Sequence, residues 1–349
     1  MKPWLFRVDA RPQIGLGHLR RSLSLAQALK QKEIPVRFAI FENLAGLEMI
    51  REAGFEADSL SGFPAWSEED LRQTAELARR AGASGLLVDS EEAGPDYLAG
   101  LGRSGFLTAV RDDLGARSFP VDLVVNGNAD AERLPYPQES TTRHLLGPRF
   151  AVLAPDFWAQ PVRGAALKGV LHLLLLAGGA DSADSLLNLA RRLGRLERFQ
   201  LTVVAGPFAQ NSLEVGKLCG ALPRPARFLK NPASLYPVMK QADLAVSAAG
   251  QTLYDLACAG CPAIAFEAAP NQAGQLRAMQ DQECVIRIES RGGFSGLEEA
   301  VLRLAGDPPR RERMARQGQR LVDGRGAARV ASEITALCSI ERQPCHPKP

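Results

Sequence analysis

Short apolar runs alternate with longer segments of helical periodicity along most of the chain, and this alternation constrains the fold more than any other feature. The apolar runs predict strands at residues 5–9, 36–41, 85–89, 107–111 and 123–126, and then at 171–177, 200–205, 244–247, 263–266 and 285–288. The segments between them predict helices, for example at residues 18–30, 67–81, 184–194, 231–242 and 251–260. Strands that are almost entirely apolar are buried on both faces, which predicts an α/β fold with parallel sheets covered by helices on either side.

The strand–helix pattern runs twice, and a stretch without periodicity separates the two runs. This stretch, residues 153–164, contains two prolines and a glycine. A chain of 349 residues is also long for a single hydrophobic core. We therefore expect two Rossmann-like, doubly wound domains at residues 1–155 and 169–340, a hinge at 156–168 and a disordered tail at 341–349. The sequence does not decide which domain receives the last helix, at about residues 326–338.

Charge and hydropathy argue against two classes of partner. The formal net charge is +3, and no run of Lys or Arg predicts a nucleic-acid surface. The longest apolar run, at residues 170–177, is far shorter than the ~18 residues that span a bilayer, so no integral membrane association is expected. The first residues read as a strand rather than a signal peptide, which makes a cytoplasmic location the expectation.

All six cysteines lie in the second half of the chain, where Cys258 and Cys261 form a Cys-x-x-Cys pair. Such a pair raises the question of zinc or redox chemistry, but no second pair has the spacing of a zinc site. The pair lies in a run of small residues before a predicted strand, so we expect buried structural thiols. Neither a metal nor a cofactor is expected.

Functional groups of open α/β sheets lie beyond the carboxyl ends of the strands, and the first such segment follows Asp9. There a loop passes through Gly15 and Gly17 into a helix that starts near His18. Glycines let a ligand approach the backbone, and a helix N-terminus offers N–H groups to an anion. A histidine in the first helical turn is expected to stay neutral, which suits a general base. The third glycine of a dinucleotide fingerprint is missing, which disfavours NAD.

Two further segments of this kind lie in the second half. Gly178 and Gly179 follow one predicted strand and either face phosphates or form a tight turn. The small residues 248–252 follow another strand and leave room for a diphosphate, and Asp255 lies one turn inside the next helix, where it could accept ribose hydroxyls. The residues expected to bind substrate are Gly15, Gly17, Arg21, Gly178, Gly179, Ala249, Gly250, Gln251, Thr252, Asp255, Asn271 and Gln272. Of these, an Asn-Gln pair before a helix can equally serve as an N-cap.

An ordered set of motifs resembles one family. Phe6-Arg-Val-Asp and Ile14-Gly-Leu-Gly-His-Leu-Arg-Arg look like the opening of the pseudaminic-acid-pathway UDP-sugar hydrolases, which act on UDP-2,4-diacetamido-2,4,6-trideoxy-β-L-altropyranose, and of the related glycosyltransferase-like proteins of spore-coat polysaccharide biosynthesis. Further matches follow in order, among them Arg111-Asp-Asp-Leu, Ala177-Gly-Gly-Ala-Asp, Ser247-Ala-Ala-Gly-Gln-Thr-Leu-Tyr, Asn271-Gln and Val322-Asp-Gly-Arg-Gly. The resemblance covers nearly the whole chain.

The resemblance implies a GT-B fold, with two Rossmann-like domains facing a cleft. It implies metal-independent hydrolysis of a UDP-linked (di)acetamido-deoxy sugar at the anomeric carbon, with release of UDP and free sugar, in nonulosonic-acid or surface-polysaccharide biosynthesis. By the same resemblance His18 would be catalytic, Asp255 would hold the ribose, and Asn271 would lie near the sugar or the diphosphate. The chain departs from the family twice: Asp255 stands where glutamate is usual, and Glu91 where an aromatic residue is usual.

The chemistry suits these residues. A neutral His18 can take a proton from water, as inverting hydrolysis requires, and helix N-termini can stabilise a leaving diphosphate. Asp9 or Asp89 could orient the imidazole, and the sequence does not choose between them. The alternatives are a glycosyltransferase with the same UDP-sugar donor site and, in another class, a non-catalytic nucleotide-sugar-binding protein.

Overall fold

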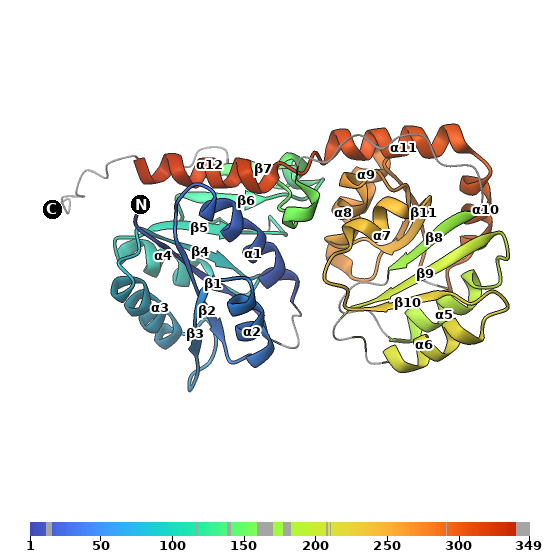
Figure 1. Cartoon of the computed structure of the whole chain (residues 1–349). Helices are drawn as coiled ribbons and strands as arrows, with labels where there is room; N and C mark the ends of the chain where they lie inside the picture. The colour runs from blue at the N-terminus through green and yellow to red at the C-terminus, as the bar shows by residue number, and fades with distance from the viewer. Residues whose placement is uncertain are drawn as a thin grey trace. The chain divides into compact units, whose positions relative to one another are not determined.

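The computed structural model describes residues 1–11, 16–115, 118–137, 141–158, 170–176, 183–206, 209, 211–290 and 292–339. The chain divides into two compact units. Unit 1 comprises Met1–Gly127, Arg133–Leu146 and the chain from Gly326 onward, and unit 2 comprises Asn128–Glu132 and Gly147–Arg325. Each unit is built on one parallel sheet with helices on both faces (Figure 1).

The sheet of unit 1 has seven parallel strands among the described residues, in the order β3-β2-β1-β4-β5-β6-β7. The strands are β1 (Trp4–Val8), β2 (Val36–Phe41), β3 (Glu56–Leu60), β4 (Gly85–Asp89), β5 (Leu107–Arg111), β6 (Leu123–Asn126) and β7 (Arg143–Leu146). β1 and β4 are buried along their whole length, as an apolar strand in a doubly covered sheet must be.

Five helices of unit 1 cover this sheet within the described residues: α1 (Gly17–Lys30), α2 (Leu44–Glu52), α3 (Glu68–Arg80), α4 (Pro95–Arg103) and α12 (Gly326–Ser339). α12 packs against α1, and its Cys338 Sγ accepts a hydrogen bond from Trp4 Nε1 of β1 at 3.2 Å. On the α3 side, Arg7 of β1 forms an ion pair with Asp70 of α3 at 2.6 Å, and both side chains are fully buried.

The sheet of unit 2 has six parallel strands among the described residues, in the order β10-β9-β8-β11-β12-β13. They are β8 (Leu171–Leu176), β9 (Phe199–Ala205), β10 (Arg227–Lys230), β11 (Leu244–Ala248), β12 (Ala263–Phe266) and β13 (Val285–Ile288). The helices are α5 (Ala183–Leu193), α6 (Ser212–Ala221), α7 (Tyr236–Gln241), α8 (Thr252–Cys258), α9 (Ala273–Asp281), α10 (Leu297–Ala305) and α11 (Pro308–Leu321). One core lies on the α5, α6 and α10 side and another on the α7, α8 and α9 side.

The predicted fold class is confirmed, and every predicted strand is present to within a residue at either end. The prediction missed β3, β7 and β10, which are edge strands of the two sheets and are only partly buried. The helix predicted at residues 231–242 is wrong in extent, because α7 begins only at Tyr236, with a proline in its first turn.

The unit boundaries differ from those expected from the sequence. The long segment of unit 2 begins at Gly147, whereas the sequence predicted that the first domain would extend to residue 155. The reason is that Ala151, Leu153 and Phe157 are buried in the core of unit 2. The last helix, α12, belongs to unit 1. Most of the predicted hinge at 156–168 and the predicted tail at 341–349 lie outside the described residues.

Candidate functional site

Both sheets have a point where the strand order reverses, and there the loops of two neighbouring strands leave toward opposite faces. In unit 1 this switch point lies between β1 and β4, and in unit 2 it lies between β8 and β11. Asp9 directly follows β1, and Asp89 is the last residue of β4. The small residues from Ala249 onward follow β11. Asp9, Asp89 and the residues from Ala249 onward therefore lie at the positions that open α/β sheets use for ligands.

His18 lies in the first turn of α1 and meets Asp89 at the switch point of unit 1. The His18 side chain is 13% exposed, and its Nδ1 lies 2.7 Å from Oδ1 of the fully buried Asp89. Arg21 and Ser22 are three and four residues further along α1, so their side chains share the helix face of His18. Ser22 Oγ donates to Asp89 Oδ2 at 2.8 Å. One helix face thus surrounds one buried carboxylate.

The carboxylate fixes which nitrogen of His18 carries the proton. An ionised Asp89 can only accept hydrogen bonds, so the 2.7 Å contact requires a proton on Nδ1. Arg21 Nη2 also lies 2.8 Å from Nδ1, but it can only donate, and Asp89 Oδ1 takes a hydrogen bond from it at 2.5 Å. With the proton on Nδ1, the Nε2 atom is left as the basic nitrogen.

Asp89 stays ionised despite its burial. Burial opposes the charge, but Arg21, His18 and Arg111 together hold the pKa of Asp89 well below its usual range. The arginine of β5, Arg111, is the register partner of Asp89, and its Nε lies 4.0 Å from Asp89 Oδ2. Within the described residues, Arg111 Nε and Nη1 are buried and have no hydrogen-bond partner. Burial and the nearby Arg21 lower the pKa of Arg111 to about 10, so it still carries its charge at neutral pH.

Arg21 was expected to contact substrate, and the structure shows that its guanidinium is engaged inside the protein. Nε donates to Asp89 Oδ2 at 3.0 Å, and Nη1 donates to Asp113 Oδ2 at 2.6 Å. Only 9% of the Arg21 side chain is exposed. Arg111, Asp113 and Ser22 were not among the predicted site residues. The Arg-Asp-Asp run at the end of a predicted strand was the one sequence signal that pointed to the first two.

Asp9, the other candidate partner of His18, has a different set of contacts. Its carboxylate accepts hydrogen bonds from Arg11 Nε and Nη2 at 3.0 and 2.8 Å and from Ser90 Oγ at 3.1 Å. Burial opposes ionisation, but Arg11 lowers the pKa of Asp9 below its usual value. The structure therefore pairs His18 with Asp89, and Asp9 with Arg11. Gly17 is the first residue of α1, and Gly15 lies outside the described residues.

In unit 2, the turn that follows β11 begins with small residues, and hydrogen bonds from buried side chains fix its backbone. The Ala249 side chain is fully buried, and its carbonyl accepts a hydrogen bond from Gln275 Nε2 at 2.9 Å. Tyr254 OH in turn donates to Gln275 Oε1 at 2.7 Å. Gln251 is the residue before α8, and no side chain caps the helix. The Leu253 and Tyr254 N–H groups donate to the carbonyls of Gly250 and Gln251 at 3.0 Å, so an anion at this end would meet the N–H groups between Ala249 and Leu253.

The other predicted residues of unit 2 differ in how close they lie to this turn. Gln272 accepts a hydrogen bond from the Ala268 N–H at 2.9 Å, and a Cβ added to Gly250 would lie 3.6 Å from Gln272 Nε2. Gln272 is thus bonded to the turn after β12 and lies beside the turn after β11. Asp255 lies in the first turn of α8, which begins at Thr252. Asn271 is exposed, and Gly178 and Gly179 lie outside the described residues.

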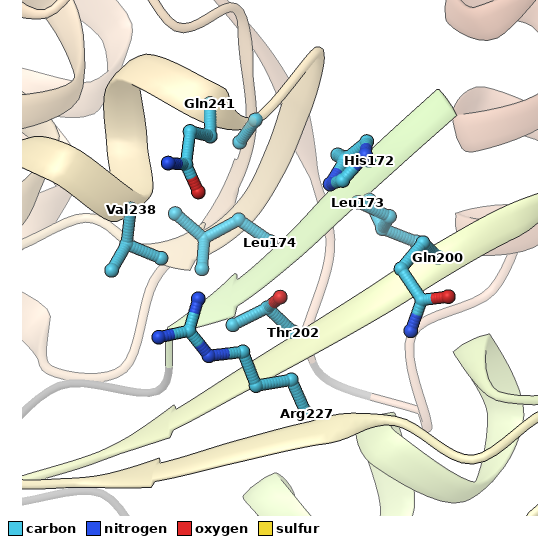
Figure 2. A pocket seen from close by; sticks show the side chains of 9 residues that line it. His172, Leu173, Leu174, Gln200, Thr202, Arg227, Val238 and Gln241 are labelled. Carbon is cyan, nitrogen blue, oxygen red and sulfur yellow. The ribbon is translucent and has the colours of Figure 1, made fainter. Parts of the chain in front are cut away.

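Two other features contribute nothing to this chemistry. Cys258 and Cys261 are buried and donate to the carbonyls of Phe157 and Ala242, and burial raises the pKa of the Cys258 thiol to about 12, so the pair is structural. A cavity of about 270 Å³ in unit 2 is lined by His172, Gln200 and Arg227 among others (Figure 2). These residues lie at the amino ends of β8, β9 and β10, the opposite end from Ala249.

Among the residues that the structure describes, no cluster of three or more His, Cys, Asp or Glu side chains is arranged to hold a metal ion. Over the same residues, every helix is too short or too polar to cross a membrane.

Comparison with known proteins finds distant relatives. The chain is 25% identical over 229 residues to the spore coat polysaccharide biosynthesis protein SpsG of Bacillus subtilis, an alignment that covers 63% of this chain and 66% of SpsG. It is 22% identical over 267 residues to the uncharacterized protein MJ1062 of Methanocaldococcus jannaschii, covering 73% of this chain and 54% of that protein. The chain thus spans less than two thirds of the length of either relative. No family model matches the sequence.

Solved structures resemble the chain over almost its whole length. MurG of Acinetobacter baumannii superposes with a TM-score of 0.67 at 13% identity and covers 96% of this chain and 99% of its own. The spinosyn rhamnosyltransferase SpnG in complex with thymidine diphosphate gives 0.67 at 16% identity, covering 97% and 100%. The S. aureus MnaA–UDP structure gives 0.66 at 12% identity, covering 98% of both chains. The chain has the GT-B fold and is a distant homologue of SpsG.

Proposed function

We propose that this protein binds a UDP-sugar and hydrolyses it at the anomeric carbon, releasing UDP and the free sugar. The observation that carries the proposal is the His18–Asp89 pair at the switch point of unit 1, because it orients a basic imidazole nitrogen where open α/β sheets bind ligands. Relatedness to SpsG, a polysaccharide biosynthesis protein, supports a nucleotide-sugar substrate, and the GT-B fold supports a nucleotide site in unit 2. The substrate class we favour is a (di)acetamido-deoxy sugar.

The roles follow from the geometry of each unit. In unit 2, the N–H groups between Ala249 and Leu253 would receive the diphosphate, and Asp255 would accept hydrogen bonds from the ribose. In unit 1, His18 Nε2 would take a proton from water as the water oxygen bonds to the anomeric carbon. The bond from that carbon to the diphosphate oxygen breaks, and its electron pair leaves with UDP. Asp89 would stabilise the imidazolium that forms.

The fold also supports a second candidate, a glycosyltransferase, because one of the similar structures is a rhamnosyltransferase. Such an enzyme would place an acceptor hydroxyl where the hydrolase places water. A non-catalytic nucleotide-sugar-binding protein would need no oriented base, which makes the His18–Asp89 pair hard to explain.

The test incubates the protein with a panel of UDP-sugars in EDTA, without any acceptor, and measures UDP by chromatography. Hydrolysis predicts UDP and free sugar from at least one acetamido donor, and a loss of roughly 10²–10⁴-fold in His18→Gln. His172→Gln makes the same chemical change in the cavity at the other end of the unit 2 sheet and should retain activity. UDP release only when an acceptor is added would support the transferase, and binding without any turnover would support the non-catalytic alternative.

A further inference from the structure

Four charged side chains behind His18 form a balanced cluster. Arg21 and Arg111 each carry a positive charge, and Asp89 and Asp113 each carry a negative one. All are buried or nearly so, since the side chains of Arg21, Arg111, Asp89 and Asp113 are 9%, 3%, 0% and 17% exposed. Charges that are buried in the protein interior interact more strongly than they would in water.

Arg21 links Asp113 to the His18–Asp89 pair. Its guanidinium donates to Asp89 through Nε and Nη2, donates to Asp113 through Nη1, and lies 2.8 Å from His18 Nδ1. A planar guanidinium fits two carboxylates at a fixed angle, which an ammonium group cannot do. The orientation of the Asp89 carboxylate, and with it that of the His18 ring, therefore depends on both ends of Arg21.

The Asp113 end is held rigidly. The preceding Asp112 accepts hydrogen bonds from the Leu114 and Gly115 N–H groups, which closes the turn after β5. Tyr136 OH donates to the same carboxylate and accepts from Asn126 Nδ2 at 2.9 Å. A side chain at the centre of so constrained a turn has a defined position, so Asp113 is a fixed anchor for Arg21.

We infer that Arg21 and Asp113 are positioning residues: they hold the His18–Asp89 pair in place and balance its charge, and Arg21 is not a substrate contact. The part of this inference that concerns turnover rests on the proposed function, whereas the part that concerns the geometry and charge of His18 does not. The charged groups facing the imidazole are Asp89 of β4, Arg21 of α1, and Arg111 and Asp113 at the end of β5.

The test uses charge changes of opposite sign. Arg21→Gln removes a positive charge beside His18, which favours the imidazolium, and Asp113→Asn removes a negative charge, which disfavours it. The pH at which the His18 imidazole titrates, followed by NMR, should rise in the first variant and fall in the second. The signal of His18 is identified by its loss in His18→Gln. Arg37→Gln, on β2, removes an equal charge that is paired with Asp58, and should leave the titration unchanged.

Turnover gives a second readout that separates position from charge. Arg21→Lys keeps the charge but cannot span both carboxylates, so the titration of His18 should stay near wild type while kcat falls about 10-fold or more and KM is little changed. A rise in KM with kcat unchanged would show that Arg21 contacts substrate, and would overturn the inference. Titration shifts of the same sign in Arg21→Gln and Asp113→Asn, or none in either, would also overturn it. If no UDP-sugar is cleaved by wild type, the proposed function fails, and the NMR titration still decides the inference.

Discussion

Asp89→Asn should remove most of the proposed hydrolytic activity. It should lower the free energy of unfolding no more than the loss of another buried carboxylate does. Asp89 is fully buried and accepts hydrogen bonds from Arg21, Ser22 and His18 at 2.5–3.2 Å. Removing one partner of a buried ion pair costs about 3–5 kcal/mol, and we expect the lower end because asparagine keeps the shape and one acceptor. The amide also no longer holds the proton on His18 Nδ1 or stabilises an imidazolium. We expect turnover to fall roughly 10²–10⁴-fold, as for loss of a positioned base.

Asp70→Asn is the matched control in the same unit. Asp70 is fully buried and bonded to Arg7 Nε and Nη2 at 3.1 and 2.6 Å, so the substitution removes the same kind of pair from the other face of the sheet. Chemical denaturation of both variants should give similar losses of stability, and UDP release should be measured where circular dichroism shows both folded. Equal turnover in the two variants would refute the proposal that Asp89 supports His18 as the base.

Three further outcomes are expected. Asp255→Ala should weaken UDP binding by about 1–3 kcal/mol in calorimetry, whereas Asp281→Ala, at the end of α9, should not change it; equal effects would remove Asp255 from the ribose site. Burial opposes ionisation of Asp70 but Arg7 depresses its pKa, so its stabilisation is present above pH ~4 and is lost as pH falls below that value; Asp70→Asn should flatten this decline, and parallel curves for mutant and wild type would contradict it. Gly324 and Gly296 both have a φ of +73°, but a Cβ on Gly324 would lie 2.2 Å from the Phe157 carbonyl oxygen and one on Gly296 would meet nothing within 4 Å. Gly296→Ala should therefore cost about 1–2 kcal/mol and Gly324→Ala distinctly more in thermal unfolding, and similar midpoints would show that the contact relaxes.

The central strands were predictable because burial on both faces forces a nearly unbroken apolar run. β4 and β12 match their predicted bounds for this reason. Edge strands escape this constraint: β3 reads Glu-Ala-Asp-Ser-Leu and is only partly buried, so its sequence resembles a loop. Its strand state comes from pairing with β2, which local sequence does not encode.

The candidate site was predictable as a set of strand ends, but not as a set of contacts. The glycine loop and His18 marked the end of β1, but the sequence did not choose between Asp9 and Asp89 as the partner of His18. The choice required knowing that Arg11 is bonded to Asp9 and that α1 places His18 beside Asp89. The role of Arg21 escaped prediction for the same reason. An arginine in the first turns of a helix next to a glycine loop suggests an anion-binding residue, and only the position of Asp113, 92 residues away in the chain, shows where its guanidinium is bonded.

The placement of α12 in unit 1 has a consequence for how the chain acquires its structure during synthesis. Trp4 and Cys338, which contact each other, are 334 positions apart, so this contact cannot form until α12 has left the ribosome. The unit 2 segment Gly147–Arg325 is complete before that point. A ribosome stalled after residue 325 should therefore display unit 2 folded, while the α1 surface that α12 covers stays open to chaperones and proteases.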